Sequence, residues 1–154
     1  MNIFIMRHGQ AEIFANSDEE RALADIGKVQ VTDQGKWLLI NAIKFDKVLV
    51  SPYQRTLDTF TVIDSVYQGI LSNKMEVDKN LTPLGDSTQV VDYLNVLKDE
   101  GLHNILIISH IPLVGELVTN LTQNSGYQSF EPATLVGINW NGKTGSLFTK
   151  HCCP

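Results

Sequence analysis

Residues 3–9 read Ile-Phe-Ile-Met-Arg-His-Gly, four apolar side chains followed at once by an arginine, a histidine and a glycine. A short apolar run that ends in charge and glycine predicts a strand buried on both faces of a sheet. The pattern returns at residues 105–110, Ile-Leu-Ile-Ile-Ser-His, the strongest strand signal in the chain. Both runs lead into a histidine, so the carboxyl ends of these strands are a candidate position for a functional site.

Helical and strand-like segments alternate around these two runs. The expected strands are residues 2–6, 47–50, 75–77 and 104–108, and the expected helices are residues 28–44, 51–70, about 90–97 and 112–121. Residues 10–27 and 123–132 are polar and are expected to be loops. The last two strands, residues 135–140 and 145–149, flank Asn141-Gly142, a strong hairpin signal. This order predicts one domain over residues 1–154, a three-layer α/β/α fold with a mostly parallel sheet and a C-terminal antiparallel hairpin.

Composition narrows the class of protein. The 154 residues are 43% hydrophobic and 19% charged, as in an ordinary soluble globular protein, and the net charge of −5 argues against a nucleic-acid binder. The longest apolar runs are too short to cross a bilayer, and residues 1–7 lack the features of a signal peptide. We therefore expect a cytoplasmic monomer without membrane or nucleic-acid partners.

The cysteines give no sign of a disulfide or metal site. Cys152 and Cys153 are adjacent and almost terminal, so we expect a reduced, frayed tail rather than an intrachain disulfide. A metal site built from His151 and the two cysteines would lack a well-placed fourth ligand. We expect neither a metal nor another cofactor.

Polar residues gather after three of the predicted strands. Arg7, His8 and Gly9 follow the first strand, Ser51 and Arg55 follow the second, and Ser109 and His110 follow the 104–108 strand. In open α/β sheets, ligands bind beyond the carboxyl ends of the strands. Two arginines and two histidines are therefore expected at one edge of the sheet.

Each of these residues also has a structural explanation. His8 or His110 alone could be a buried histidine bonded to the main chain, and Arg7 could simply pair with an acidic residue. Arg55 could pair with Asp58 on its own helix, an ion pair that stabilises little when exposed. The convergence of all four residues favours the chemical interpretation.

The position of Arg55 adds an electrostatic argument. Ser51, Pro52 and Gln54 predict a helix start with a capping box, which places Arg55 in the first turn. A cation there opposes the helix dipole at a cost of roughly 0.3–1 kcal/mol, and a bound anion reverses that sign. Together with the planar fork of Arg7, this predicts a site for a phosphate or carboxylate.

These residue types suit phosphoryl transfer through a histidine. A neutral imidazole is a competent nucleophile, and the Gly9 carbonyl is placed to fix the tautomer of His8. Arg7, Arg55 and a protonated His110 would neutralise the phosphoryl oxygens, so the reaction needs positioning and charge but no metal.

Three segments carry a resemblance to a known family. Arg7-His8-Gly9, the stretch Ser-Pro-Tyr-Gln-Arg-Thr at 51–56, and Ser109-His110 resemble the signature of the histidine phosphatase superfamily, with its phosphoglycerate mutase-like fold. The chain resembles most the small bacterial phosphohistidine phosphatases of the SixA type, over nearly its whole length and most weakly after about Gln123.

The resemblance also implies roles for individual residues. It makes His8 the phosphate acceptor and places Arg7, Arg55 and His110 in the phosphate pocket. It places substrate-binding positions at Gly9, Ser51 and Ser109, and Arg21 at the rim.

The sequence departs from the family where a general acid is often found. Asn80 stands where a glutamate often precedes Leu-Thr-Pro. The nearest carboxylate, Asp86, could be a general acid, but the first turn of the next helix is the preferred interpretation; Asp18 is another nearby candidate. A phosphoramidate needs less general-acid help than an ester, because its imidazole is a good leaving group once protonated.

The substrate implied is a phosphorylated histidine phosphotransfer domain of a two-component relay, or another phosphohistidine protein. A small-molecule phosphomonoesterase or mutase and a non-catalytic phosphopeptide-binding module are the alternatives. The chain is too short for large insertions that would enclose a small metabolite, which disfavours the phosphomonoesterase or mutase. The intact His8 and His110 disfavour a binding module without catalytic activity.

Overall fold

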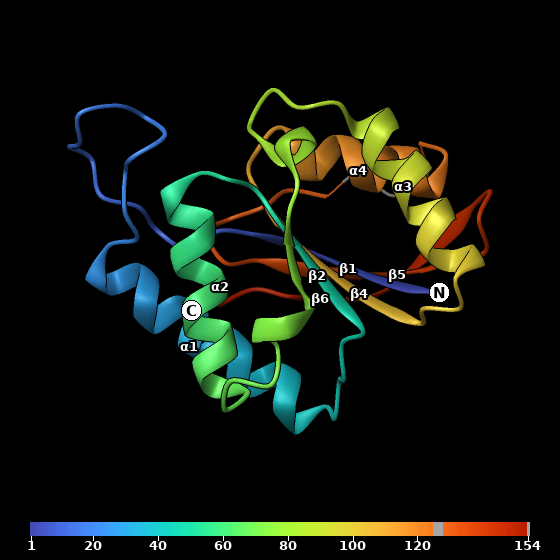
Figure 1. Ribbon diagram of the computed structural model, residues 1–154, viewed down its shortest axis with the longest axis horizontal. Helices are drawn as coiled ribbons and strands as arrows, with labels where there is room; N and C mark the ends of the chain where they lie inside the picture. The colour runs from blue at the N-terminus through green and yellow to red at the C-terminus, as the bar shows by residue number, and fades with distance from the viewer. Residues whose placement is uncertain (125–127, 154) are drawn as a thin grey trace.

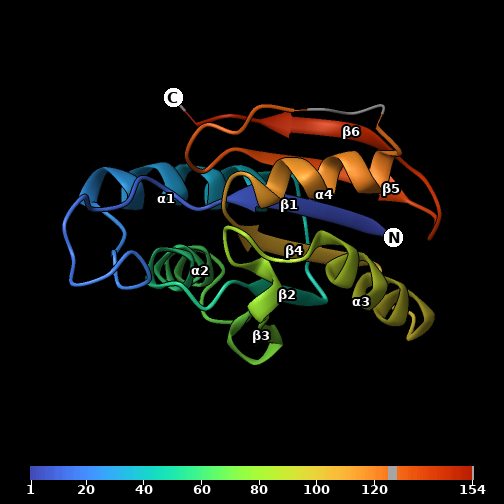
Figure 2. The same cartoon turned by 90° about the horizontal axis from the view of Figure 1, so that it is seen from above.

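A six-stranded sheet forms the centre of the computed structural model, which describes residues 1–124 and 128–153. The strands are β1 (Asn2–Arg7), β2 (Lys47–Val50), β3 (Met75–Val77), β4 (Asn104–Ser109), β5 (Leu135–Trp140) and β6 (Gly145–His151), in the spatial order β3-β2-β4-β1-β5-β6. Strands β1 to β4 pair in parallel, whereas β5 runs antiparallel to β1 and β6 antiparallel to β5. Figure 2 shows β1 between β4 and β5.

Helices cover both faces of this sheet. They are α1 (Asp25–Ile40), α2 (Gln54–Val66), α3 (Ser87–Asp99) and α4 (Leu113–Thr122), with short 3₁₀ helices η1 (Ser72–Lys74) and η2 (Lys79–Leu81). In Figure 1, α1 and α2 lie on one side of the sheet and α3 and α4 on the other. The predicted three-layer α/β/α class is confirmed, including the antiparallel C-terminal strands.

The apolar runs are buried from both sides, as their composition predicts. Ile3 and Ile5 pack into the cluster formed with α3 and α4, whereas Phe4 and Met6 pack into the cluster formed with α1 and α2. Each fully buried side chain of this size stabilises the fold by about 1.5–3 kcal/mol. A one-residue slip of β1 would exchange the two faces, so burial fixes the register and with it the position of His8.

Helices α1 and α2 differ from their predicted ranges at both ends. Helix α1 runs from Asp25 to Ile40, earlier than the expected 28–44. Helix α2 begins at Gln54, and its N-cap Tyr53 makes no side-chain capping bond, so the predicted cap at Ser51 is wrong. The Ser51 hydroxyl instead bonds to the distant His110 ring and accepts from the amide of Tyr53, which precedes the first helical residue.

The C-terminal part of the chain is more ordered than expected. Strand β6 extends to His151, whose ring stacks on Trp37 with centroids 4.5 Å apart. Cys152 is exposed and Cys153 is partly buried, with its Sγ 3.2 Å from the Gln30 carbonyl; both are free thiols. The predicted frayed tail is therefore wrong up to Cys153.

The predicted loop 123–132 includes residues 125–127, which lie outside the described residues. Within the described parts of the chain, no helix combines the length and the apolar character needed to cross a bilayer. The same residues contain no group of three potential metal ligands from His, Cys, Asp and Glu.

Candidate active site

Two histidines lie side by side where β1 and β4 end. Arg7 pairs in register with Ser109, so the next residues, His8 and His110, emerge together. The His8 amide donates to the Ser109 carbonyl at 3.0 Å, and the imidazole ring centroids are 5.2 Å apart. Both rings are buried, with 7% and 1% of their residues' surface exposed. The parallel pairing of two strands distant in sequence thus builds the centre of the site.

Arg55 reaches the same point from the first turn of α2. Its Nε donates to Nε2 of His8 at 3.3 Å, and the residue is only 5% exposed. Its Nη1 donates to the main-chain carbonyl of Asp18 at 2.8 Å, and its Nη2 lies 3.2 Å from the Asp18 carboxylate. The alternative partner considered from sequence, Asp58, instead accepts from the Leu23 amide and from Gln54.

The hydrogen bonds of His8 define its tautomer. Nδ1 lies 2.6 Å from the carbonyl oxygen of Gly9, which can only accept, so Nδ1 carries the proton. Nε2 then accepts from Arg55 with its lone pair. Burial lowers the pKa of His8 to about 4, against the Gly9 hydrogen bond, and the nearby charges of Arg55, Arg7 and Arg21 lower it further. At neutral pH the ring is an uncharged imidazole with an unprotonated Nε2.

His110 is held by the hydroxyl of Ser51. Its Nε2 lies 2.8 Å from the Ser51 oxygen, and its Nδ1 has no hydrogen-bond partner among the described residues. Burial lowers the pKa of His110 to about 3, helped by His8 and Arg55 and opposed by Asp18. Both imidazoles are therefore neutral in the phosphate-free protein, and a protonated His110 with phosphate bound stays a prediction.

Arg7 leaves a second donor without a partner. Its Nη1 donates to the Phe130 carbonyl at 2.9 Å, but its buried Nε has no partner in the described part of the chain. Burial lowers the pKa of Arg7, opposed by the charge of Glu131 and helped by that of Arg55. Buried polar groups without partners are rare, because each costs about 1–3 kcal/mol. Nε of Arg7 and Nδ1 of His110 are thus available to bind an anion.

The other predicted site residues contact the protein itself. The Gly9 amide donates to Thr59, and a Cβ on Gly9 would lie 2.8 Å from the Gly27 carbonyl oxygen. The Ser109 hydroxyl donates to the Leu81 carbonyl at 2.6 Å. Arg21 donates from Nη1 to the Asp18 carboxylate and from Nε to the Glu12 carbonyl, which keeps its charge near His8.

Sequence reasoning missed three supporting side chains. Asp18 binds both Arg55 and Arg21, whereas the sequence suggested it only as a candidate general acid. The Tyr53 ring packs edge-on against His110, with centroids 5.1 Å apart, and lies 5.0 Å from the Arg55 guanidinium carbon. Thr59, one helical turn after Arg55, could have been noticed from its spacing, whereas Asp18 and Tyr53 carry no local signal.

The candidate acid Asp86 has a structural role. It is the N-cap of α3, and its carboxylate accepts from the amides of Thr88 and Gln89. Asn80 lies in η2, where its main-chain amide donates to Asp78.

Taken together, the site combines a neutral nucleophilic nitrogen with cationic and neutral donors, an arrangement suited to transfer of a phosphoryl group.

Comparison with known proteins gives one family. The family profile for the histidine phosphatase superfamily (branch 1) matches residues 3–82. The whole chain is 44% identical to a phosphohistidine phosphatase SixA homolog of Haemophilus influenzae, of which 97% is covered. It is 33% identical to phosphohistidine phosphatase SixA of Escherichia coli, of which 94% is covered.

Solved structures agree with this result. The protein histidine phosphatase SixA complexed with tungstate superposes with a TM-score of 0.93 at 33% identity, over 99% of this chain and 97% of that one. A phosphoglycerate mutase from Bacillus anthracis shares the fold, with a TM-score of 0.76 at 16% identity over 96% and 91% of the two chains.

Proposed function

This chain belongs to the histidine phosphatase superfamily, and on that premise we propose that it hydrolyses phosphohistidine in another protein by way of a phosphoryl group carried on His8. The observation that carries the proposal is the unprotonated Nε2 of a neutral, buried His8, in contact with Arg55 and beside His110. The relatives named as phosphohistidine phosphatases support the choice of substrate.

The phosphoryl group binds first to the donors that lack partners. Nε of Arg7 donates to one phosphoryl oxygen. With Ser51 donating its hydroxyl proton to Nε2 of His110, the ring proton lies on Nδ1 and is available to a second oxygen. The approaching negative charge raises the pKa of both imidazoles, since opposite charges favour the protonated form. These donors fix the phosphorus in front of His8.

Phosphoryl transfer to His8 follows. Arg55 shifts its Nε hydrogen bond from His8 to a phosphoryl oxygen, which frees the Nε2 lone pair to form the new bond to phosphorus. The bond between phosphorus and the substrate imidazole breaks, and its electron pair remains on that imidazole, which leaves neutral because its other nitrogen is protonated. The Gly9 carbonyl accepts from Nδ1 and stabilises the positive charge that develops on His8.

Water completes the reaction. It attacks the phosphorus of phospho-His8, the bond to Nε2 breaks, and inorganic phosphate leaves with His8 again neutral. Arg7, Arg55 and His110 stabilise the phosphoryl oxygens in both steps. The proposed cycle consumes one water and requires neither a metal nor a cofactor, and its groups all come from residues 1–154.

The two carboxylates that the sequence suggested as general acids favour a phosphoramidate over an ester. Asp86 caps a helix, and Asp18 is bound to two arginines, which hold the pKa of its carboxyl below the usual range, with the Arg21 hydrogen bond as the largest cause. Neither is placed as a proton donor to an alkoxide. A histidine-containing phosphotransfer domain of a two-component relay presents a leaving imidazole and is the substrate we propose.

The test compares substrates and a nucleophile variant. The protein should dephosphorylate a phosphorylated histidine phosphotransfer domain much faster than a panel of phosphate esters, and His8→Ala should abolish turnover. Alkaline quenching of a reaction with labelled substrate should give label on a peptide that contains His8. Turnover by His8→Ala, or label on another residue, would contradict the mechanism; faster hydrolysis of esters would contradict the substrate.

A further inference from the structure

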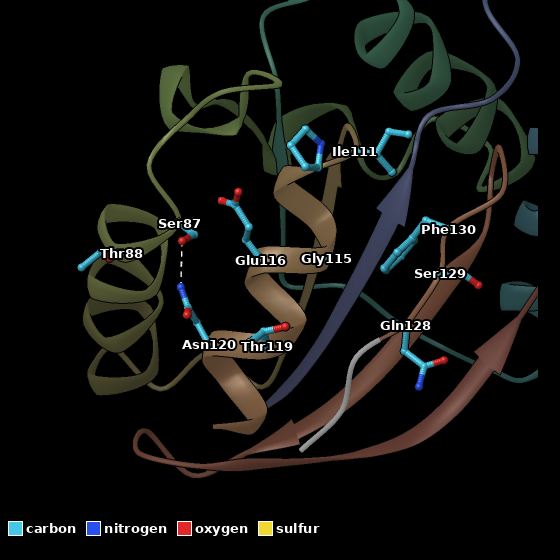
Figure 3. Close-up of a pocket in the computed structure, with 11 residues that line it drawn as sticks. Ser87, Thr88, Ile111, Gly115, Glu116, Thr119, Asn120, Gln128, Ser129 and Phe130 are labelled. Carbon is cyan, nitrogen blue, oxygen red and sulfur yellow. Dashed lines mark hydrogen bonds between the residues drawn. The ribbon is translucent and has the colours of Figure 1, made fainter. Parts of the chain in front are cut away.

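A groove lies directly beside the candidate phosphate pocket. Its volume is about 760 Å³. Three segments line it: the start of α3 (Ser87, Thr88), the exposed face of α4 and the turn before it (Ile111, Pro112, Gly115, Glu116, Thr119, Asn120), and residues 128–130. Figure 3 shows Gly115 and Thr119 on α4 between Ser87 on one side and Phe130 on the other. The face of α4 is thus the floor, and the other two segments are the walls.

Two residues that line the groove, Ile111 and Phe130, adjoin residues of the phosphate pocket. Ile111, which is 48% exposed, follows His110 directly in the chain. The Phe130 carbonyl accepts the hydrogen bond from Nη1 of Arg7. A substrate protein that presents its phosphoryl group to His8 therefore lies next to this groove.

Gly115 on the groove floor is not explained by the fold. Among the glycines that the structure describes, it is the one with neither a positive φ nor a heavy atom within 4 Å of an added Cβ. Glycine inside a helix is less favourable than alanine, so folding alone favours a side chain here. By contrast, a Cβ on Gly9 would lie 2.8 Å, and one on Gly85 2.0 Å, from main-chain oxygens. The absence of a side chain at Gly115 therefore suits contact with another molecule and not packing within this chain.

The lining has a pattern that suits a second helix. On α4, Gly115 and Thr119 lie four residues apart in one row, and Glu116 and Asn120 form the next row; Ile111 and Pro112 lie in the turn before the helix and line the same groove. Rows with this spacing receive the side chains of a packed helix, and a glycine lets the two backbones approach. An amphipathic helix laid in such a groove is a recurring mode of protein recognition.

Charge distinguishes between possible occupants. Glu116 is exposed and is the one charged side chain among the described residues that line the groove. It repels the negative charge of a small phosphorylated metabolite and attracts a lysine or arginine. The occupant is therefore a protein surface with apolar and basic side chains.

We propose that this groove binds an α-helix of the phosphohistidine-bearing protein, with a basic residue against Glu116, while the phosphohistidine enters the pocket of His8. The inference rests on the proposed function and adds the surface that selects a protein substrate. The phosphate pocket alone recognises the phosphoryl group, whereas the groove recognises the chain that carries it.

The test blocks the groove without touching the pocket. Gly115→Leu fills the groove floor, and Gln89→Leu, on a different face of α3 in a separate groove, is the matched control. Each variant is assayed with a phosphorylated histidine phosphotransfer domain and with N-phosphoimidazole. Gly115→Leu should lower kcat/KM for the protein substrate at least tenfold, mainly through KM, and leave N-phosphoimidazole hydrolysis within twofold. Gln89→Leu should change neither.

Two further variants separate docking from damage. Gly115→Ala should raise the melting temperature slightly, because alanine suits a helix better than glycine, and should show a smaller loss on the protein substrate. Glu116→Lys should raise KM for the protein substrate alone, with Glu100→Lys at the exposed end of α3 as the charge-matched control.

The other outcomes overturn the inference in distinguishable ways. Wild-type rates of Gly115→Leu on the protein substrate mean that the groove does not dock it. Equal losses on both substrates assign the groove to the phosphate pocket, and a selective loss on N-phosphoimidazole makes it a subsite for small molecules. Failure of the wild-type protein to hydrolyse either phosphoramidate would instead contradict the proposed function.

Discussion

Arg55 on α2 and Asp18 in the loop after β1 are 37 positions apart in the chain and form an ion pair of 3.2 Å. The Asp18 carbonyl accepts a second hydrogen bond from Arg55, and the other carboxylate oxygen binds Arg21 at 2.8 Å. A single exposed carboxylate thus orients one buried guanidinium and one half-buried guanidinium at the phosphate pocket.

Replacing Asp18 by alanine should therefore impair catalysis more than folding. The Asp18 side chain is 57% exposed, so its loss should change the free energy of unfolding by less than about 1 kcal/mol. The value of kcat/KM on a phosphohistidine protein should fall about tenfold, because Arg55 loses one of its holding contacts. Glu20→Gln, on the same loop, is the control for loss of charge. A rise in kcat/KM would show instead that Asp18 competes with the phosphoryl group.

Arg55 itself should not be replaceable by lysine. Its Nε bonds to His8 while Nη1 and Nη2 bond to Asp18, and an ammonium cannot reproduce this fork. Arg55→Lys should lower kcat about 100-fold, the scale seen when one donor to a developing negative charge is removed. Arg55→Ala should lower it further while circular dichroism stays native. An unfolded Arg55→Ala together with a fully active Arg55→Lys would assign Arg55 to the fold.

The two predicted serines should behave differently. Ser51→Ala removes the partner of the buried His110 ring and should lower kcat about tenfold, since it disturbs the placement of a catalytic group, in addition to a loss of about 1–3 kcal/mol of unfolding free energy. Ser109→Ala leaves the buried Leu81 carbonyl without its donor and should cost about 1–3 kcal/mol of unfolding free energy. Urea unfolding and steady-state kinetics on both variants separate the effects. Equal kinetic losses in both would indicate direct substrate contact.

The neutral imidazoles should make stability depend on pH. The pKa of His8 is lowered to about 4 and that of His110 to about 3, both by burial first. Between the unfolded pKa near 6.5 and these values, the unfolded chain binds more protons than the folded one, so the free energy of unfolding falls as pH falls. Each group contributes a slope of about 1.4 kcal/mol per pH unit in that window. Above pH 6.5 neither contributes a slope.

Urea unfolding at pH 7 and pH 5 measures this slope. His8→Gln removes one titrating group and should reduce the loss of stability between the two pH values. An unchanged loss in His8→Gln would mean that His8 is already protonated in the folded protein at pH 5.

Local patterns were sufficient for the sheet but not for the loops. The expected strand 47–50 coincides with β2, and β1 and β4 each extend only one residue beyond their predicted ends, because burial on both faces leaves a continuous apolar run in the sequence. The same runs predicted that His8 and His110 would meet. Such pairing needs only strand direction and register.

The rest of the site depends on contacts that no local pattern records. Residues 8–24 form a loop held by an isolated bridge between Ala11 and Leu23. The course of this loop in the folded protein brings Asp18 to Arg55, which is distant in the sequence. The Ser51 cap was mispredicted for the same reason, since His110, 59 positions away, uses that hydroxyl. The low pKa of His110 likewise depends on the burial of its imidazole ring. The apolar run predicted a buried strand, but it did not predict that the histidine after the strand is buried too.

The central place of β1 also determines when the protein can become active during its synthesis. The strand that leads into His8 is made before both of its neighbours, Asn104–Ser109 and Leu135–Trp140. A ribosome must therefore add more than a hundred residues before either hydrogen-bonding edge of β1 can be paired, and such distant pairings form slowly. A nascent chain therefore carries its nucleophile long before His110 and the paired strands complete the catalytic centre.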